Sequence, residues 1–108
     1  MRAVVAGPDR GIAAALEAEG FVVETVEGAV TGADLEAAGI GDAALFVLTD
    51  ASEATSIPVA RDHNPDLRIV VYDPDSMPEF VRGQVDLAVA PDVLDAEAVA
   101  EELAGTDA

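Results

Sequence analysis

Short apolar runs alternate along the chain with segments in which apolar residues recur every three or four positions. The runs are rich in Val, Ile, Leu and Ala, which predicts buried strands at residues 2–6, 21–26, 44–48, 67–72 and 86–90. Helical patterns fill the intervals at 12–19, 33–38, 52–63, 76–82 and 96–103. This alternation with short connections predicts an α/β fold, a Rossmann-like half in three layers. We expect a parallel five-stranded sheet in the order 3-2-1-4-5.

Residues that start or stop helices flank most of these segments. Gly20 and Gly39 are natural helix stops, and the pair Asn64-Pro65 ends the third helical segment. Ser52 and Asp95 are expected N-caps, and residues 76–79 form a capping-box pattern. One domain over residues 1–104 and a frayed tail at 105–108 follow from this organisation.

The loops after the strands are where an open parallel sheet binds ligands. After the first strand, Gly7 makes the turn and Gly11 suits close packing of the helix, a pattern similar to a dinucleotide loop. Asp9 stands where that loop has a second glycine, and Arg10 offsets its charge or holds a phosphate. Glu27, at the end of the second strand, has the position of an acid that binds ribose hydroxyls. The alternative is an ordinary tight turn in which Asp9 lies near a helix N-terminus.

Several longer segments resemble the TrkA-N type of nucleotide-binding domain found in regulators of potassium conductance. The resemblance runs through residues 34–40, 44–50, 60–70 and 85–91. It implies binding of NAD(H) or an adenine nucleotide, with Gly7, Arg10 and Gly11 at the phosphates, Glu27 at the ribose, and Thr49 and Asp50 over the nucleotide. Asp9, and residues 54–56 in place of a more usual acid and asparagine, depart from the family pattern.

The large excess of acidic over basic residues excludes some classes of binding partner. The chain has 22 acidic residues against 5 arginines and no lysine, and its net charge is -17. Nucleic acid and anionic membranes would be repelled. The acid-rich, lysine-free composition resembles that of halophilic archaeal proteins, in which molar salt screens self-repulsion. No signal peptide or transmembrane segment is visible, so we expect a cytoplasmic protein. A homodimer through apolar residues near 77–81 is a further expectation.

The sequence gives weaker support for catalysis, metal binding or phosphorylation. His63, the single histidine, ends a predicted helix, where capping is its ordinary role. Asp50, Asp73 and Asp75 are a candidate cation site, but clusters arise by chance among so many acids, so no metal is expected. A phosphoacceptor receiver domain has similar topology, but it needs a lysine after the fifth strand, and the chain has none. We therefore expect a stand-alone, non-catalytic nucleotide-binding regulatory domain. The alternative is a Rossmann scaffold that has lost its ligand and acts by protein–protein contact.

Overall fold

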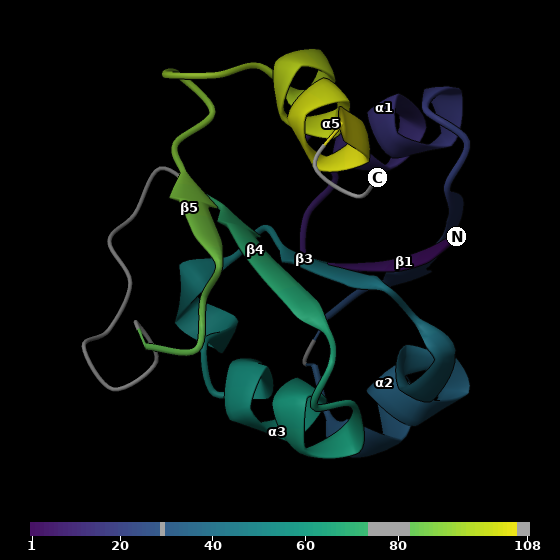
Figure 1. The fold of residues 1–108 in the computed structure, drawn as a ribbon. Helices are drawn as coiled ribbons and strands as arrows, with labels where there is room; N and C mark the ends of the chain where they lie inside the picture. The colour runs from purple at the N-terminus through teal and green to yellow at the C-terminus, as the bar shows by residue number, and fades with distance from the viewer. Residues whose placement is uncertain (29, 74–82, 106–108) are drawn as a thin grey trace.

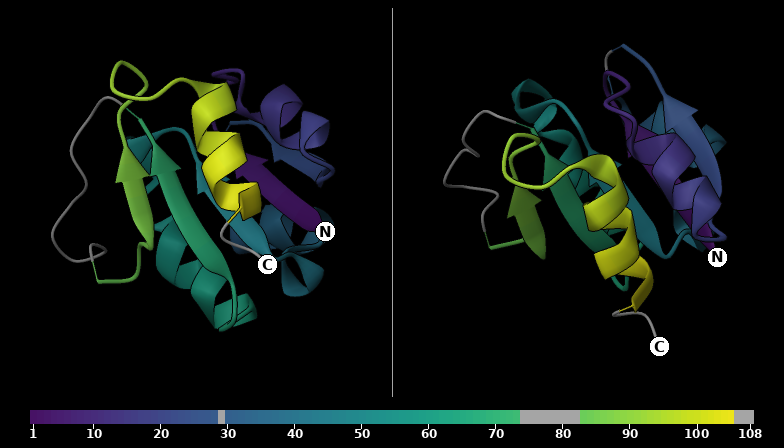
Figure 2. Two further views of the ribbon diagram at one scale, coloured as in Figure 1. Left: turned by 45° about the horizontal axis from the view of Figure 1, so that its top comes forward. Right: turned by 90° about the horizontal axis from the view of Figure 1, so that it is seen from above.

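A five-stranded sheet lies between two layers of helices. The computed structural model describes residues 1–28, 30–73 and 83–105. All strand pairs are parallel: β1 (Arg2–Ala6), β2 (Val22–Val26), β3 (Leu45–Leu48), β4 (Arg68–Tyr72) and β5 (Leu87–Val89). Helices α1 (Ile12–Ala18) and α5 (Ala96–Gly105) cover one face, and α2 (Gly32–Ala37) and α3 (Ser56–His63) cover the other (Figure 1, Figure 2). The predicted α/β class and parallel five-stranded sheet are confirmed.

The predicted strand order is wrong. The strands lie in the order β2-β1-β3-β4-β5, so β3 is next to β1 and β2 forms an edge. Burial explains this arrangement, because every residue of β3 is buried whereas Val22, Glu24 and Thr25 of β2 are exposed. A fully apolar strand belongs in the centre, where both faces are covered. The right-handed crossover rule alone does not decide which side of β1 the third strand joins.

The two faces of the sheet form separate hydrophobic cores. Alternate residues of each strand point to opposite faces, so Val4 and Phe46 pack toward α2 and α3, while Val5 and Val47 pack toward α1 and α5. Two groups of helical residues complete the cores. On one side these are Leu35, Ile57 and Ala60, and on the other Ile12, Leu16, Val99 and Leu103.

The ends of the helices show which capping residues in the sequence predicted the helix boundaries correctly. Asp95 caps α5 as predicted, accepting a hydrogen bond from Ala98 N at 2.8 Å. The helix α3 ends at His63 as expected, and His63 Nδ1 lies 2.9 Å from Val59 O, in agreement with the capping role. The expected helix over 52–63 is divided, because a short 3-10 turn η2 (Ala51–Glu53) precedes α3. Ser52 is not the cap there; Asp50 caps η2 by accepting a hydrogen bond from Ser52 N.

A second 3-10 turn, η1 (Ile40–Asp42), connects α2 to β3. The predicted helix at 76–82, the apolar residues near 77–81 and most of the expected frayed tail lie outside the described residues. Among the residues that are described, each helix lacks either the length or the apolar character needed to cross a membrane.

Candidate functional site

The carboxyl ends of the strands bring the loop after β1 against the end of β3. Gly7 has φ +110, a left-handed value that glycine adopts at little cost. A Cβ at Gly7 would clash with Thr49 Oγ1 and would lie 3.2 Å from Asp50 N. This glycine is therefore explained by the close approach of the protein's own β3 end, without reference to a phosphate.

Thr49 and Arg10 bind this loop to the end of β3. Thr49 is fully buried, and its Oγ1 lies 2.7 Å from Pro8 O and 3.1 Å from Ala6 O. Arg10 Nε donates a hydrogen bond to Thr49 O at 2.9 Å. The Arg10 guanidinium thus links the loop after β1 to the end of β3.

Asp9 and Asp50 each cap a backbone turn. Asp9 Oδ1 accepts a hydrogen bond from Gly11 N at 2.8 Å, so this N–H at the start of α1 is already used. Asp50 Oδ1 accepts hydrogen bonds from Ser52 Oγ at 2.6 Å and Ser52 N at 2.9 Å. These two bonds lower the pKa of the Asp50 carboxyl; burial opposes them, and the charge of Arg10 adds a smaller lowering effect.

Asp73 follows β4 and is buried. Its Oδ2 accepts a hydrogen bond from Ala51 N at 2.5 Å, which connects the end of β4 to η2. Within residues 1–28, 30–73 and 83–105, no group of three or more His, Cys, Asp or Glu side chains is arranged to hold a metal ion. Asp75, the third member of the carboxylate cluster considered above, lies outside those residues.

An open depression of about 410 Å³ lies beside this edge. Its lining comes from the ends of β1, β2 and β3: Gly7, Pro8, Glu27, Gly28, Asp50 and Glu53. Glu53 also accepts a hydrogen bond from Val30 N at 2.8 Å. Three carboxylates at one small depression make it a poor place for the phosphates of a nucleotide, because like charges at close range repel.

The candidate residues named from the sequence do lie at one edge of the sheet. Gly7, Glu27 and Asp50 share the depression, and Asp9, Arg10, Gly11 and Thr49 form the adjoining loop and strand end. Sequence reasoning missed Tyr72, whose hydroxyl donates to Leu94 O at 2.8 Å, and Glu53. Tyr72 is the last residue of β4, whereas the candidates named from the sequence all follow a strand.

A family profile matches residues 3–103, which is nearly the whole chain. The chain belongs to DUF7126, a family of unknown function. No curated protein matches its sequence.

Solved structures similar to this DUF7126 chain share its fold at low sequence identity. An orphan response regulator from H. pylori has a TM-score of 0.73 at 13% identity, with 97% of this chain and 94% of that chain covered. A putative pilus assembly-related protein from Burkholderia pseudomallei has a TM-score of 0.70 at 17% identity, with 100% and 92% covered. An atypical orphan response regulator, described as having a phosphorylation-independent regulatory mechanism, has a TM-score of 0.68 at 15% identity, with 97% and 93% covered.

These comparisons correct the expected family and function. The resemblance to TrkA-N domains is wrong, since the family matched is DUF7126 and the similar folds are those of response regulators and pilus assembly proteins. The expected function as a nucleotide-binding regulatory domain is wrong for the same reason. The strand order 2-1-3-4-5 is itself the flavodoxin-like order rather than the dinucleotide-binding one. In this chain the glycine of the strand-to-helix turn makes room for Thr49 and Asp50, so its presence did not indicate a phosphate site.

Proposed function

We propose that this chain is a response-regulator-like regulatory domain that acts by protein contact and does not use phosphorylation. The fold supports the regulatory class, and the carboxyl edge of the sheet supports independence from phosphorylation. Contact with a partner protein was also the alternative expected from the sequence, in the form of a Rossmann scaffold that has lost its ligand.

The single observation that carries the proposal is the use of carboxylates at that edge as structural caps. Asp9, Asp50 and Asp73 accept hydrogen bonds from the backbone N–H groups of Gly11, Ser52 and Ala51 respectively. Phosphoryl transfer to a carboxylate relies on a divalent cation and fixed positive charge to neutralise the developing negative charge. The chain has no lysine to supply such a charge, and Arg10 is hydrogen-bonded to Thr49 O.

The first test exposes the protein to small phosphoryl donors. Isotope-labelled protein is incubated with Mg²⁺ and acetyl phosphate, and separately with Mg²⁺ and beryllofluoride. We expect an unchanged intact mass and unchanged amide spectra. A phosphoryl adduct, or new amide signals near Asp50 that disappear in Asp50→Asn, would overturn the claim that phosphorylation plays no part.

The second test addresses the regulatory role in the cell. Deleting the gene is expected to change the set of expressed proteins, and both the wild-type allele and an Asp50→Asn allele are expected to restore it. The amide introduced by Asp50→Asn retains a side-chain oxygen that can cap η2, so the variant removes the charge with little effect on the turn. A deletion without any effect on expression would contradict a regulatory function.

A further inference from the structure

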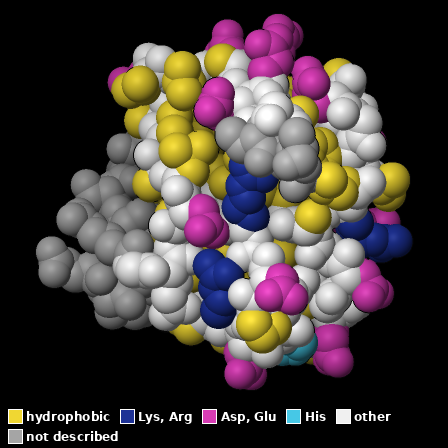
Figure 3. Space-filling view, viewed as in Figure 1, with side chains coloured by type: hydrophobic (Ala, Val, Ile, Leu, Met, Phe, Trp, Pro, Cys, Tyr) yellow, Lys and Arg dark blue, Asp and Glu magenta, His cyan; other side chains and the backbone are white. Residues whose placement is uncertain are grey.

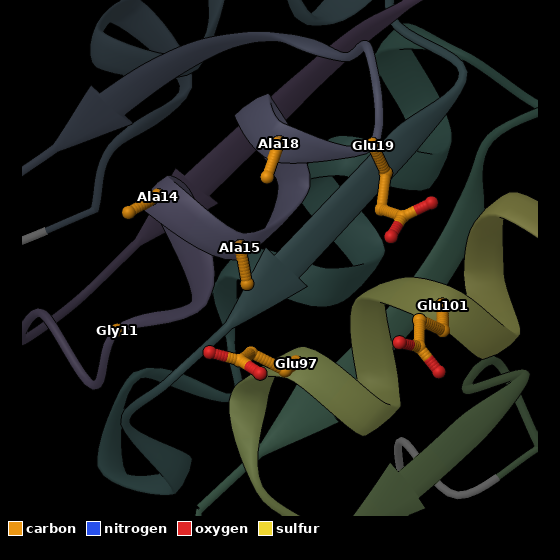
Figure 4. A pocket seen from close by; sticks show the side chains of 7 residues that line it. All are labelled: Gly11, Ala14, Ala15, Ala18, Glu19, Glu97 and Glu101. Carbon is orange, nitrogen blue, oxygen red and sulfur yellow. The ribbon is translucent and has the colours of Figure 1, made fainter.

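A groove between α1 and α5 lies on the face opposite α2 and α3. It has a volume of about 300 Å³ (Figure 4). Gly11, Ala14, Ala15 and Ala18 line it from the α1 side. Glu19, which follows α1, and Glu97 and Glu101 of α5 complete the lining.

The apolar floor exists because α1 carries only small side chains on the flank facing α5. Its large apolar residues, Ile12 and Leu16, point into the core. The start of α1 approaches α5 closely, since a Cβ at Gly11 would lie 3.7 Å from Ala96 Cβ. Further along, the alanines leave the hollow unfilled, and Ala14 and Ala18 remain exposed.

The rim of the groove carries negative charge, and no basic side chain among the described residues lines it. Glu97 and Glu101 are one turn apart on α5, a spacing at which like charges repel. In the part of the chain that the structure describes, the carboxylates of Glu19, Glu97 and Glu101 form no hydrogen bond or ion pair. Figure 4 shows these three side chains around the space toward which Ala15 and Ala18 also point.

Three arginines of this chain are engaged elsewhere. Arg10, Arg61 and Arg68 donate hydrogen bonds to the carbonyl groups of Thr49, Leu67 and Leu103 respectively. On the face shown in Figure 3, acidic side chains are widely spread, whereas the basic ones occur at a few separate places. The Arg2 guanidinium lies beside Gly39, and no arginine among the described residues lines the groove, so a partner molecule is the source of positive charge that we consider.

Resting on the proposed function, we propose that the α1–α5 groove docks an amphipathic helix of a partner protein that bears arginine or lysine on one face. The alanine floor allows a third helix to approach closely, since interaxial distance depends on side-chain size at the contact. The aliphatic stem of an arginine can lie on the alanines while its guanidinium reaches the carboxylates.

The negative charge of the groove favours a basic helix over a second copy of this chain or a nucleic acid. A second copy of the chain would bring another net charge of -17 to an acidic rim. A nucleic acid would bring phosphates. A contact limited to the seven residues that line the groove is small compared with the roughly 20–30 residues per partner in a stable interface, so the contact is expected to be transient.

The test uses a synthetic helical peptide with arginine on one face and leucine and alanine on the other. It is titrated into isotope-labelled protein at the lowest KCl concentration at which the protein is folded. We expect amide shifts concentrated at residues 11–19 and 96–101. A Glu97→Gln/Glu101→Gln double variant should weaken binding at least about fivefold, through loss of charge-assisted contacts.

Matched variants separate the groove from the general acidity of the surface. Glu24→Gln/Glu36→Gln removes the same charge at exposed positions outside the groove lining, and should change the affinity by less than about twofold. Ala18→Leu fills the groove without changing the charge and should also reduce binding. A scrambled peptide of the same composition should bind more weakly.

Three results would overturn this proposal: shifts scattered over the whole surface, equal weakening by the two double variants, or no effect of Ala18→Leu. Each of them leaves the phosphoryl-donor and allele-replacement experiments untouched, because those do not use the groove. Failure of the docking proposal and failure of the proposed function are therefore distinguishable.

Discussion

Individual side chains at the carboxyl edge of the sheet serve the packing of the loops. Thr49 illustrates this, because its buried hydroxyl lies within hydrogen-bond distance of two carbonyl oxygens in the β1–α1 segment. Such a contact requires that the β1–α1 loop come close to β3, and Gly7 provides the space. The two residues lie far apart in the sequence but form one packing unit.

Replacing Gly7 with alanine should therefore destabilise the protein by at least about 2 kcal/mol, because it combines a left-handed φ with a steric clash. Gly20→Ala is the matched control. Gly20 also has a positive φ, +98, but a Cβ there would meet nothing within 4 Å, so only about 1 kcal/mol is expected. Denaturant unfolding at high KCl measures both values. Equal losses would show that the contact with Thr49 is unimportant.

Tyr72 offers a pH test at the residue scale. Burial, and less strongly the carboxylate of Asp95, raises the pKa of the Tyr72 phenol above its ordinary value. The folded state thus favours the neutral phenol. Its contribution to stability is fully present below about pH 10, the ordinary pKa of tyrosine, and is lost as pH rises through the folded value.

Absorbance titration measures this pKa directly, since Tyr72 is the sole tyrosine and the chain has no tryptophan. The folded protein should titrate at higher pH than the protein in denaturant. Asp95→Asn keeps a capping side chain for α5 and should shift the midpoint part of the way down. Identical midpoints in the folded and unfolded protein would contradict the burial effect.

At the scale of elements, β5 is the shortest strand, and its attachment depends on α3. Arg61 of α3 donates to Leu67 O at 2.5 Å and to Gln84 O at 2.8 Å, and its Nη2 lies 3.5 Å from Asp86 Oδ2. Asp86 in turn accepts a hydrogen bond from Ile69 N at 2.7 Å. One guanidinium thus joins the end of a helix to the segments before two strands.

Arg61→Lys should loosen β5 selectively. A lysine ammonium is a compact group without the planar fork of arginine, so it cannot reproduce all these contacts. We expect a loss of about 1–2 kcal/mol in stability and faster amide exchange at residues 87–89. The amides of β1 serve as the internal control, and equal acceleration there would indicate general destabilisation rather than release of one strand.

At the scale of the whole molecule, stability depends on the net charge. With a net charge of -17, repulsion between carboxylates opposes folding at low salt. The Debye length falls from about 10 Å at 0.1 M to about 3 Å at 1 M salt, which screens all but the closest pairs.

The melting temperature should accordingly rise between low and molar KCl. A variant in which several exposed glutamates, including Glu24 and Glu36, are replaced by glutamine should show a shallower rise. Scanning calorimetry over a KCl series checks both expectations. A flat curve for the wild-type chain would show that repulsion does not limit its stability.

The local signals in the sequence were sufficient for most elements. Apolar runs marked all five strands, Asp95 marked the start of α5, and Asn64-Pro65 marked the end of α3. The order of the strands was not predicted, although Glu24 and Thr25 in β2 carried the sign of an edge strand. The candidate site residues were brought to one edge as expected, but the function inferred from them was wrong.

What the sequence determined by itself are the features that depend on neighbouring residues: the periodicity that selects strand or helix, the caps, and the overall charge. Only the tertiary structure decided which strand lies at the centre, and what the loop residues contact. Gly7 faces Thr49, and Asp9, Asp50 and Asp73 bind backbone N–H groups. A glycine or a carboxylate has the same local signature whether its partner is a ligand or the protein's own backbone, and long-range packing determines which of the two it meets.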